Sequence, residues 1–465
     1  MPPDLALVEI DVSDPTQPHE ISRMNMSGNV VAARMVEASM RLVVAGQPPG
    51  LPFVTPAFVL SRWPVAQQQD PHAWERSERM ALSQNRAIIT ESQISDWLPQ
   101  IRISGAAGAS TVSAGCESLA RPHEFSGLSI TSVLTFDTAG AAPTTPVDVF
   151  GLVSDAATVY ASAENIYVAT QQWQDWAALP EAEWDRAAGF TTTEIHRFDT
   201  SDPSAVSYRG SGEVAGWLYS QWALSESDGF LRVASTTQSP WYGQRPETTQ
   251  SIVSVLSIDE GALSHVGGVT GLGVTEQIYA VRFIGDKGYV VTYRQVDPLY
   301  VIDLADPTDP GVAGELKIPG YSAYLHPIGE DLLLGVGQDG DLQGRTIGSQ
   351  IALFDVSDPT SPTQLDKLTM RGAYSGAEWD HHAFLYWPES DDAGLVVLPI
   401  QAPTWQGSLA VDVDSGGVRR VGELEQSGYV LRNLVVGERL FTVTDLGIQS
   451  YDFDSLEPEQ WLPFA

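Results

Sequence analysis

The stretch LYVIDLADPTDP at residues 299–310 joins a short apolar strand to an Asp-rich turn, and the same pattern recurs along the chain. Close copies are LVEIDVSDPTQP at residues 7–18, EIHRFDTSDPSA at residues 194–205 and IALFDVSDPTSP at residues 351–362. Degenerate copies end apolar runs at Asp137, Asp259, Asp412 and Asp452. A pattern that recurs along a chain in this way indicates a repeat architecture.

Each copy predicts a sharp corner between two strands. The first Asp can accept hydrogen bonds from backbone amides two residues further on, and the Asp-Pro step fixes φ and prevents the strand from continuing. Each corner is followed by a further apolar alternation and then by two strands around a tight polar turn, as in residues 277–295 with the turn at residues 285–288. The repeating unit therefore has four short strands.

The spacing of the corners predicts the fold class. From Asp199 to Asp452 the corners follow one another at 40 to 60 residues, close to the roughly 40 to 50 residues of a propeller blade. Radial closure protects the edges of so many small sheets. Seven inner strand pairs lie between Val30 and Thr444. We therefore predict an all-β protein, a β-propeller of four-stranded antiparallel blades, with seven blades and eight as the alternative, forming a single domain over residues 1–465.

The N-terminal part departs from the repeat in two ways. The segment through Met26 resembles the outer two strands of a blade without its inner pair, so we expect an incomplete first blade. Residues 50–125 form an insertion with helical segments around residues 70–100: one helix over residues 72–89 after an Asp70-Pro71 cap, and a short second helix that ends before Pro99. A Gly/Ala/Ser-rich loop is expected over residues 104–115.

Composition limits the classes of partner and compartment. The 59 acidic against 25 basic residues give a formal net charge of -34, which repels nucleic acid and anionic membrane surfaces. The single cysteine, Cys116, excludes an internal disulfide framework and a Cys-based zinc site. The start of the chain has no signal segment, and no run of about 18 apolar residues occurs. We therefore expect no membrane span, and either a cytoplasmic protein or a chain recorded without its true beginning.

Residues 282–338 resemble a family of secreted prokaryotic β-propellers that is distantly related to WD40 repeats. Further similar blocks are NRAIITESQISDWLP at residues 85–99, CESLARPHEFSG at residues 116–127, GWLYSQWALSESDGFLRVAST at residues 216–236 and WDHHAFLYWPE at residues 379–389. The resemblance covers most of residues 28–450 and implies an extracellular or cell-surface protein. Members of the family usually begin with a signal segment and further propeller sequence, so the resemblance favours a truncated N-terminus.

The cluster Asp380-His381-His382 is the most suggestive group for chemistry, because carboxylate and imidazole together suit a divalent transition metal. On a β-strand, however, adjacent residues point to opposite faces, so His381 and His382 would not readily share one ion. A structural hydrogen bond near the central channel is the favoured interpretation of this cluster.

Calcium is the other metal that the sequence allows. The Asp pairs of the corners and the pair Asp339 and Asp341 could supply oxygen ligands, but their spacing does not match an EF-hand loop. Turn formation explains these residues more simply. We therefore expect no cofactor, with calcium as the alternative.

No motif in the sequence indicates a particular enzyme. A G-x-S-x-G elbow is missing, Cys116 has no adjacent histidine, and the carboxylates are too numerous for one catalytic pair to be chosen. Exposed aromatic candidates for ligand contact are Trp74, Trp97, Trp173, Trp176 and Trp241. We predict a monomeric, non-enzymatic extracellular module that binds a protein or polysaccharide of the cell envelope. The alternatives are an extracellular hydrolase with a site at the channel mouth and a calcium-stabilised structural domain.

Overall fold

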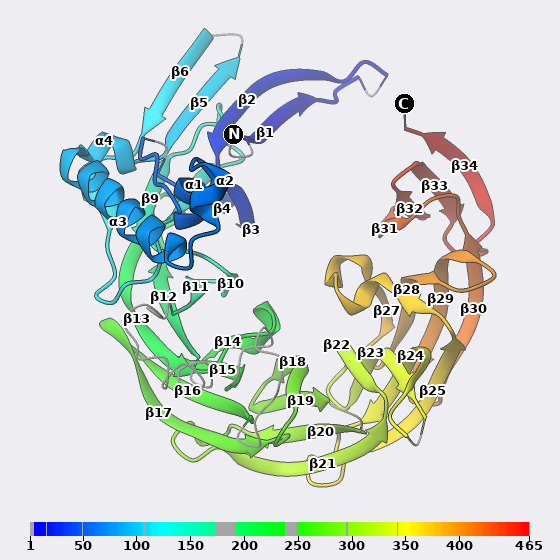
Figure 1. Ribbon diagram of the computed structural model, residues 1–465. Helices are drawn as coiled ribbons and strands as arrows, with labels where there is room; N and C mark the ends of the chain where they lie inside the picture. The colour runs from blue at the N-terminus through cyan, green and yellow to red at the C-terminus, as the bar shows by residue number, and fades with distance from the viewer. Residues whose placement is uncertain are drawn as a thin grey trace. The chain divides into compact units, whose positions relative to one another are not determined.

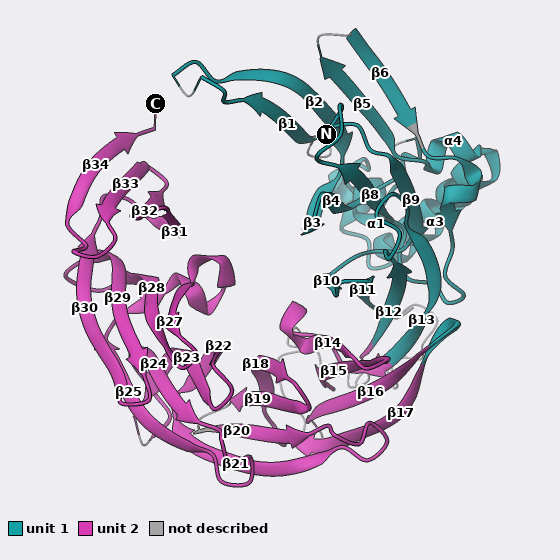
Figure 2. Cartoon of the chain, turned by 180° about the vertical axis from the view of Figure 1, so that it is seen from behind, with its two compact units in different colours: residues 1–176, 193–213, 259–263 teal, residues 177–192, 214–258, 264–465 magenta. Residues whose placement is uncertain are grey.

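The computed structural model describes residues 4–14, 16–48, 50–105, 108–172, 191–237, 249–293, 296–341 and 343–464. Strands in small antiparallel sheets dominate these residues, and the longer helices gather near the N-terminus (Figure 1). The chain divides into two compact units (Figure 2). Unit 1 comprises residues 1–176, 193–213 and 259–263, and unit 2 comprises residues 177–192, 214–258 and 264–465. The predicted fold class, a propeller of four-stranded blades with a small helical insertion, is confirmed.

Beside a four-stranded N-terminal sheet formed by residues 4–27 and 100–113, seven further four-stranded modules occur within the described residues, and successive strands of each module are neighbours in a sheet. The first two modules are β3 (Asn29–Val36), β4 (Ser39–Gly46), β8 (Ile130–Asp137) and β9 (Asp148–Val153), then β10 (Thr158–Ala161), β11 (Asn165–Gln171), β12 (Thr192–Asp199) and β13 (Ser207–Ala215). The next two are β14 (Leu224–Ser227), β15 (Phe230–Thr236), β16 (Ser251–Asp259) and β17 (Gly261–Leu272), then β18 (Gln277–Ile284), β19 (Lys287–Tyr293), β20 (Val296–Asp303) and β21 (Gly311–Pro319).

The remaining modules lie in unit 2. They are β22 (Tyr321–Ile328), β23 (Leu332–Gly340), β24 (Thr346–Asp355) and β25 (Thr363–Arg371), then β27 (Leu385–Ser390), β28 (Ala393–Gln401), β29 (Gln406–Asp414) and β30 (Gly417–Glu425), then β31 (Val430–Val436), β32 (Arg439–Thr444), β33 (Gly447–Asp452) and β34 (Pro458–Pro463). In the module of β27, the short strand β26 (Tyr374–Ser375) also pairs with β28, so two segments share one strand position.

The Asp-rich corners form as the sequence predicts. The first Asp of a corner accepts a hydrogen bond from the amide two residues on, as Asp355 does from Ser357 at 3.0 Å. The second Asp does the same, as Asp358 does from Thr360 at 2.9 Å. Register shifts interrupt the pairing one or two residues before the corner, for example between Leu353 and Phe354. The corner therefore combines a turn with a β-bulge, which ends the strand and turns the chain back.

Middle strands carry the core of each module. In unit 2, β23 is buried along its whole length, and Leu334, Val336 and Leu353 belong to a large apolar cluster. In unit 1, a corresponding cluster holds the fully buried side chains of Met24, Leu134 and Phe136. Alternating side chains from neighbouring modules meet in these clusters, which is the packing expected of half-buried strands.

The N-terminal hairpin is completed by the insertion. The strands β1 (Asp4–Asp11) and β2 (His19–Ser27) form a sheet in the order β1-β2-β5-β6 with β5 (Gln100–Gly105) and β6 (Gly108–Ser113). The predicted loop over residues 104–115 was therefore wrong for most of its length. Ile101 of β5 is fully buried beside Met24, and this burial together with pairing to β2 outweighs the weak strand propensity of the Gly/Ala/Ser-rich segment.

Among its described residues the insertion contains four α-helices, α1 (Pro56–Ser61), α2 (Val65–Gln68), α3 (Ala73–Glu91) and α4 (Ile94–Trp97). The helices α3 and α4 were predicted, whereas α1 and α2 were not, although Thr55 caps α1 and Pro56 opens it. The Asp70 carboxylate does not cap α3 directly. It accepts the amide of His72 at 2.8 Å, and the helix begins at Ala73. None of the helices in the described residues combines the length and apolar character needed to cross a membrane.

Candidate functional site

The predicted Asp380-His381-His382 cluster lies in unit 2 on a tight turn. We call residues 374–384 the turn segment; it contains β26 and two 3-10 helices, η4 (Gly376–Glu378) and η5 (His381–Ala383). The expectation that His381 and His382 point apart because they lie on a strand was therefore wrong. The 3-10 turn brings the two ring centroids to 4.1 Å. The sequence signal that could have shown this is the Asp380 side chain, which caps η5 by accepting the amide of His382 at 3.0 Å.

Asp380 also joins the turn segment to the next module. The Arg432 guanidinium of β31 donates to Asp380 Oδ2 at 2.7 Å. Burial raises the pKa of Asp380, but the bonds from Arg432 and the His382 amide outweigh it and hold the pKa below its usual value. The carboxylate is therefore ionised and bound to a cation at neutral pH. This contact gives Asp380 a structural hydrogen bond, while its predicted position near a central channel stays a prediction.

Beneath the turn segment lies a layer of aromatic rings. The His381 ring meets Trp222 edge-on at 5.2 Å, and its Nε2 lies 2.9 Å from Gln221 Nε2. The Arg282 guanidinium stacks over the same Trp222 ring, 4.0 Å from its centre. The layer continues from Tyr324 to His326 and Tyr386, and Phe384, the last residue of the turn segment, packs against Tyr324. Such a layer holds the turn segment rigidly in place.

Burial and the nearby Arg282 together depress the pKa of His326 to about 4. His326 is therefore neutral at physiological pH and acts as a packing and hydrogen-bonding side chain, 3.2 Å from the Tyr324 hydroxyl. Burial raises the pKa of Glu378, at the end of η4, because burial disfavours the charged carboxylate. The Ser375 amide and the Gln338 side chain donate hydrogen bonds to this carboxyl group.

The outer side of the turn segment exposes apolar and polar groups together. The Trp379 side chain is 62% exposed and that of Tyr374 is 55% exposed. His382 is also exposed, next to the Asp380–Arg432 ion pair. Exposed rings beside fixed hydrogen-bonding groups are typical of ligand contact surfaces. Trp379 and Tyr374 were not singled out from the sequence, because nothing local distinguishes them from the packing aromatics.

The tryptophans that the sequence analysis proposed for ligand contact do not belong to the turn segment. Trp74, on α3, is 50% exposed and donates from Nε1 to Glu78 at 2.7 Å. Trp97, at the end of α4, is half-buried against Phe53 and donates to Ser92 Oγ at 3.0 Å. Both belong to unit 1, whereas Asp380 and His381 belong to unit 2. Trp173, Trp176 and Trp241 lie outside the described residues.

The calcium candidates have other partners in the structure. The buried Asp339 accepts the Lys367 ammonium group at 2.7 Å, and Asp341 accepts the Arg345 guanidinium at 2.8 Å. Each carboxylate thus already faces a cation. The part of the chain that the structure describes contains no group of three or more His, Cys, Asp or Glu side chains that could hold a metal ion. Calcium binding stays a prediction.

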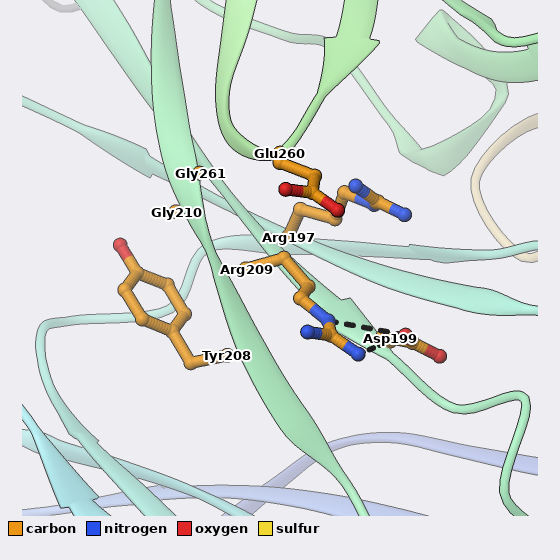
Figure 3. A pocket seen from close by; sticks show the side chains of 7 residues that line it. All are labelled: Arg197, Asp199, Tyr208, Arg209, Gly210, Glu260 and Gly261. Carbon is orange, nitrogen blue, oxygen red and sulfur yellow. Dashed lines mark hydrogen bonds and ion pairs between the residues drawn. The ribbon is translucent and has the colours of Figure 1, made fainter.

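Unit 1 contains an open polar pocket of about 610 Å³ that the sequence did not indicate (Figure 3). It is lined by Arg197, Asp199, Tyr208, Arg209, Gly210, Glu260 and Gly261. The corner at Asp199 supplies one wall, where Arg209 donates to Asp199 Oδ2 from Nη2 at 2.8 Å and from Nε at 3.1 Å. Burial raises the pKa of Asp199, but the hydrogen bonds from Ser201 and Arg209 outweigh this effect, and the net result is a pKa lowered to about 2.

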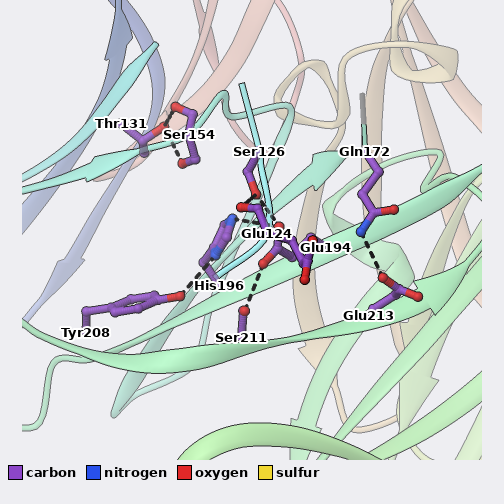
Figure 4. A network of polar contacts seen from close by, with 10 residues as sticks. All are labelled: Glu124, Ser126, Thr131, Ser154, Gln172, Glu194, His196, Tyr208, Ser211 and Glu213. Atoms are coloured by element: carbon purple, nitrogen blue, oxygen red, sulfur yellow. Dashed lines mark hydrogen bonds and ion pairs between the residues drawn. The ribbon is translucent and has the colours of Figure 1, made fainter. Parts of the chain in front are cut away.

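A buried polar network lies on the opposite face of β12 (Figure 4). Glu194 accepts hydrogen bonds from Ser126 and from Ser211, the latter at 2.9 Å. The Nδ1 atom of His196 lies 3.3 Å from the Tyr208 hydroxyl. Burial lowers the pKa of His196 to about 4, so the imidazole is neutral. The network ties β12 to β13 and to the segment that carries Ser126, which is a structural role.

One sequence signal could have revealed this region. The corner copy at residues 194–205 carries Glu194, His196 and Arg197 in its strand, where the copy at residues 299–310 has apolar side chains next to its Asp. The other close copies have Val8, Tyr300 and Ala352 at the position of His196, and an imidazole there indicates a local departure from pure packing.

Two curated archaeal relatives are similar to part of the chain. A protein of Methanocaldococcus jannaschii is 40% identical over 261 residues, which are 55% of this chain and 39% of that protein. A protein of Archaeoglobus fulgidus is 36% identical over 248 residues, which are 53% of this chain and 36% of that protein. The matched stretch thus spans less than half the length of either relative.

Solved structures with a similar arrangement share little sequence with this chain. The dihydro-heme d1 dehydrogenase NirN has a TM-score of 0.46 at 15% identity, covering 90% of this chain and 82% of NirN. Sqt1 of Saccharomyces cerevisiae has a TM-score of 0.42 at 10% identity, covering 74% of this chain and 84% of Sqt1.

The family comparison covers nearly the whole chain. The model of the family described as "Beta propeller domain" matches residues 2–456. This range includes the four-stranded modules from β3 to β30 in full and the first three strands, β31 to β33, of the last module. The chain therefore belongs to the beta propeller domain family.

Proposed function

We propose that the protein is a non-enzymatic binding module of the cell exterior, and that the outer side of the turn segment binds a polysaccharide of the cell envelope. The observation that carries the proposal is the exposed Trp379 ring, next in sequence to Asp380, whose carboxylate is paired with Arg432. Sugar rings present an apolar face and a rim of hydroxyl groups. An exposed indole can cover the face, while a carboxylate, a guanidinium and an imidazole can bond the rim.

Rigidity supports binding at this surface. The turn segment is held by contacts of His381 with Trp222 and of Phe384 with Tyr324, and by the bond from Arg432 to Asp380. A surface that is already ordered loses little conformational entropy when a ligand binds, so weak individual contacts can contribute to affinity. The charge of -34 is compatible with a neutral polysaccharide and opposes strongly anionic polymers.

The extracellular location and the monomeric state are parts of the same proposal. Support for the location comes from the resemblance of residues 282–338 to secreted propellers. Size-exclusion chromatography with light scattering of the purified chain tests the monomeric state. Protease treatment of intact producer cells tests exposure at the surface.

The binding test compares Trp379→Ala with Trp461→Ala, a second exposed tryptophan in unit 2, on β34. Purified protein is titrated with a panel of neutral and acidic polysaccharides from the producer's envelope. We expect Trp379→Ala to weaken binding by about tenfold or more, since an aromatic contact contributes about 1 kcal/mol beyond its buried area. Trp461→Ala should bind as the unchanged protein does.

Three results would overturn the proposal. The first is equal binding by the Trp379→Ala variant and the unchanged protein. The second is capture of an envelope protein, but of no polysaccharide, by the unchanged chain, which would make this surface a protein-binding one. The third is release of soluble sugar from the polymers, which would show a hydrolase.

A further inference from the structure

Two glycines that face each other across neighbouring strands line part of the pocket in unit 1. Strand β13 pairs in parallel with the first residues of β17, with Gly210 opposite Gly261 and Ser211 opposite Ala262. A Cβ atom on Gly210 would lie 2.0 Å from the Gly261 carbonyl oxygen, so no side chain fits there. The two glycines leave the sheet surface bare between larger neighbours, and the hollow of about 610 Å³ lies over them.

Strand alternation decides which side chains face the hollow. Arg197 and Asp199 are two residues apart on β12 and share a face, and Asp199 bonds Arg209 of β13 on that face. Tyr208 points to the other face, toward His196. In Figure 3, the side chains of Arg197, Arg209 and Glu260 lie on one side of the strand that carries Gly210. The Tyr208 ring lies on the other side of that strand.

The charges in the pocket are unequally compensated. Arg209 is neutralised by Asp199. Arg197 is held by neutral oxygens, with Nε donating to Asn165 Oδ1 at 2.8 Å and Nη1 to the Asp259 carbonyl at 3.4 Å. Within the described ranges, Arg197 makes no ion pair, and the exposed Glu260 at the β16–β17 turn makes neither a hydrogen bond nor an ion pair. The pocket therefore offers one fixed cation and one anion that do not pair with each other.

We propose that this pocket binds a small zwitterion of the amino-acid type, with the ligand carboxylate on Arg197 and its ammonium group on Glu260. With Nε and Nη1 of Arg197 each donating one hydrogen bond, the guanidinium still has its remaining Nη hydrogens as donors for a carboxylate. A simple anion meets repulsion from Glu260 and from the acidic chain as a whole. A simple cation meets repulsion from Arg197. Only a ligand with both charges satisfies both side chains at once.

The volume fits this class of ligand. Small-molecule pockets commonly enclose about 300 to 1,000 Å³, so an amino acid or a dipeptide would fit with room for its side chains. The pocket lies in unit 1, and the proposal is independent of polysaccharide binding by unit 2.

Saturation-transfer NMR on the full chain tests the pocket with glycine and diglycine as zwitterionic probes, and with acetate and methylammonium as probes of one charge. We expect the zwitterions to bind and each singly charged probe to bind at least tenfold more weakly. Arg197→Gln and Glu260→Gln should each lower zwitterion affinity by about tenfold or more, as loss of a charge-assisted hydrogen bond does. Arg419→Gln and Glu330→Gln, which remove exposed charges in unit 2, are the matched controls and should change nothing.

Several outcomes would overturn the inference. Absence of zwitterion binding by the unchanged protein is one, and acetate binding as strongly as glycine is another, because the pocket would then be a plain anion site. Unchanged affinity in Glu260→Gln is a third. Glu260 lies exposed in a turn, so this variant is expected to fold even where Arg197→Gln does not.

Discussion

His196 shows how a strand holds a polar side chain neutral. It lies in β12 with no exposed surface, and its Nε2 atom has no hydrogen-bond partner within the described residues. The nearest carboxylate oxygen, Glu194 Oε2, is 3.9 Å away. Burial therefore lowers the pKa of the imidazole from 6.5 to about 4. A protonated imidazole at this position would have neither water around it nor a carboxylate within hydrogen-bond distance, so protonation is unfavourable.

This depressed pKa predicts an acid-sensitive stability. The unfolded chain takes up the proton near pH 6.5, whereas the folded chain does so only near pH 4. The contribution of neutral His196 is fully present above about pH 6.5 and is lost as the pH falls toward 4. A shift of this size corresponds to about 3 kcal/mol. We expect the thermal unfolding midpoint to fall over this range, and to fall less steeply in His196→Asn.

The matched control is His265→Asn, because His265 lies exposed on β17. Its unfolding midpoint should follow the same pH dependence as that of the unchanged protein. Parallel curves for His196→Asn and the unchanged protein would contradict the assignment of the acid sensitivity to His196.

At the scale of elements, the contact between β13 and β17 depends on glycine. Gly210 has φ of 112° and lies against the Gly261 backbone. We expect Gly210→Ala to destabilise the protein by clearly more than the roughly 1 to 2 kcal/mol of backbone strain alone, because the added methyl group must also displace a strand.

Gly229 separates these two effects. It has φ of 82° in the turn between β14 and β15, and a Cβ there meets no atom within 4 Å. Gly229→Ala should therefore cost only the strain. Denaturant unfolding of both variants measures the difference, and equal losses of stability would show that the close approach of the two strands contributes nothing.

The elements that could be predicted from the sequence are those governed by local chemistry. Each Asp-rich corner contains its own hydrogen-bond acceptors, so the turn at Asp355 follows from the adjacent residues. The strand β5 does not follow from its residues, because its structure depends on β2, a partner far away in the sequence. The turn at Asp380 was missed because its cap was not recognised within a segment that resembles a strand.

The candidate sites show the same division. Asp380 and His381 were found because their residue types are unusual together, although the wrong local structure was assigned to them. The unusual polar residues of β12 mark the neighbourhood of the zwitterion pocket, but the pocket itself could not be found, since it exists only where Gly210 of one module meets Gly261 of the next. Two separated glycines carry no signal of that meeting.

At the scale of the whole molecule, the net charge of -34 acts on every element. Like charges repel one another in the folded chain, and salt screens this repulsion. We expect the thermal unfolding midpoint to rise when sodium chloride is increased from about 0.01 M to about 0.15 M, as the screening length falls from about 30 Å to about 8 Å.

Calcium chloride at the same ionic strength distinguishes screening from binding. Screening alone predicts no stabilisation beyond that of a magnesium salt at matched ionic strength. A larger rise with calcium, reversed by a chelator, would support the calcium-stabilised alternative. A midpoint that falls or stays constant with sodium chloride would show that self-repulsion does not limit stability.

The pairing of β2 with β5 imposes an order on biosynthesis. Met26 faces Ile101, and the whole helical insertion lies between them in the chain. The hairpin β1–β2 is translated well before β5, so it must wait on the ribosome with Met24 uncovered until β5 emerges. Closing such a distant contact is slow compared with forming a local hairpin. Burial of Met24 therefore depends on a strand that is synthesised only after the whole helical insertion.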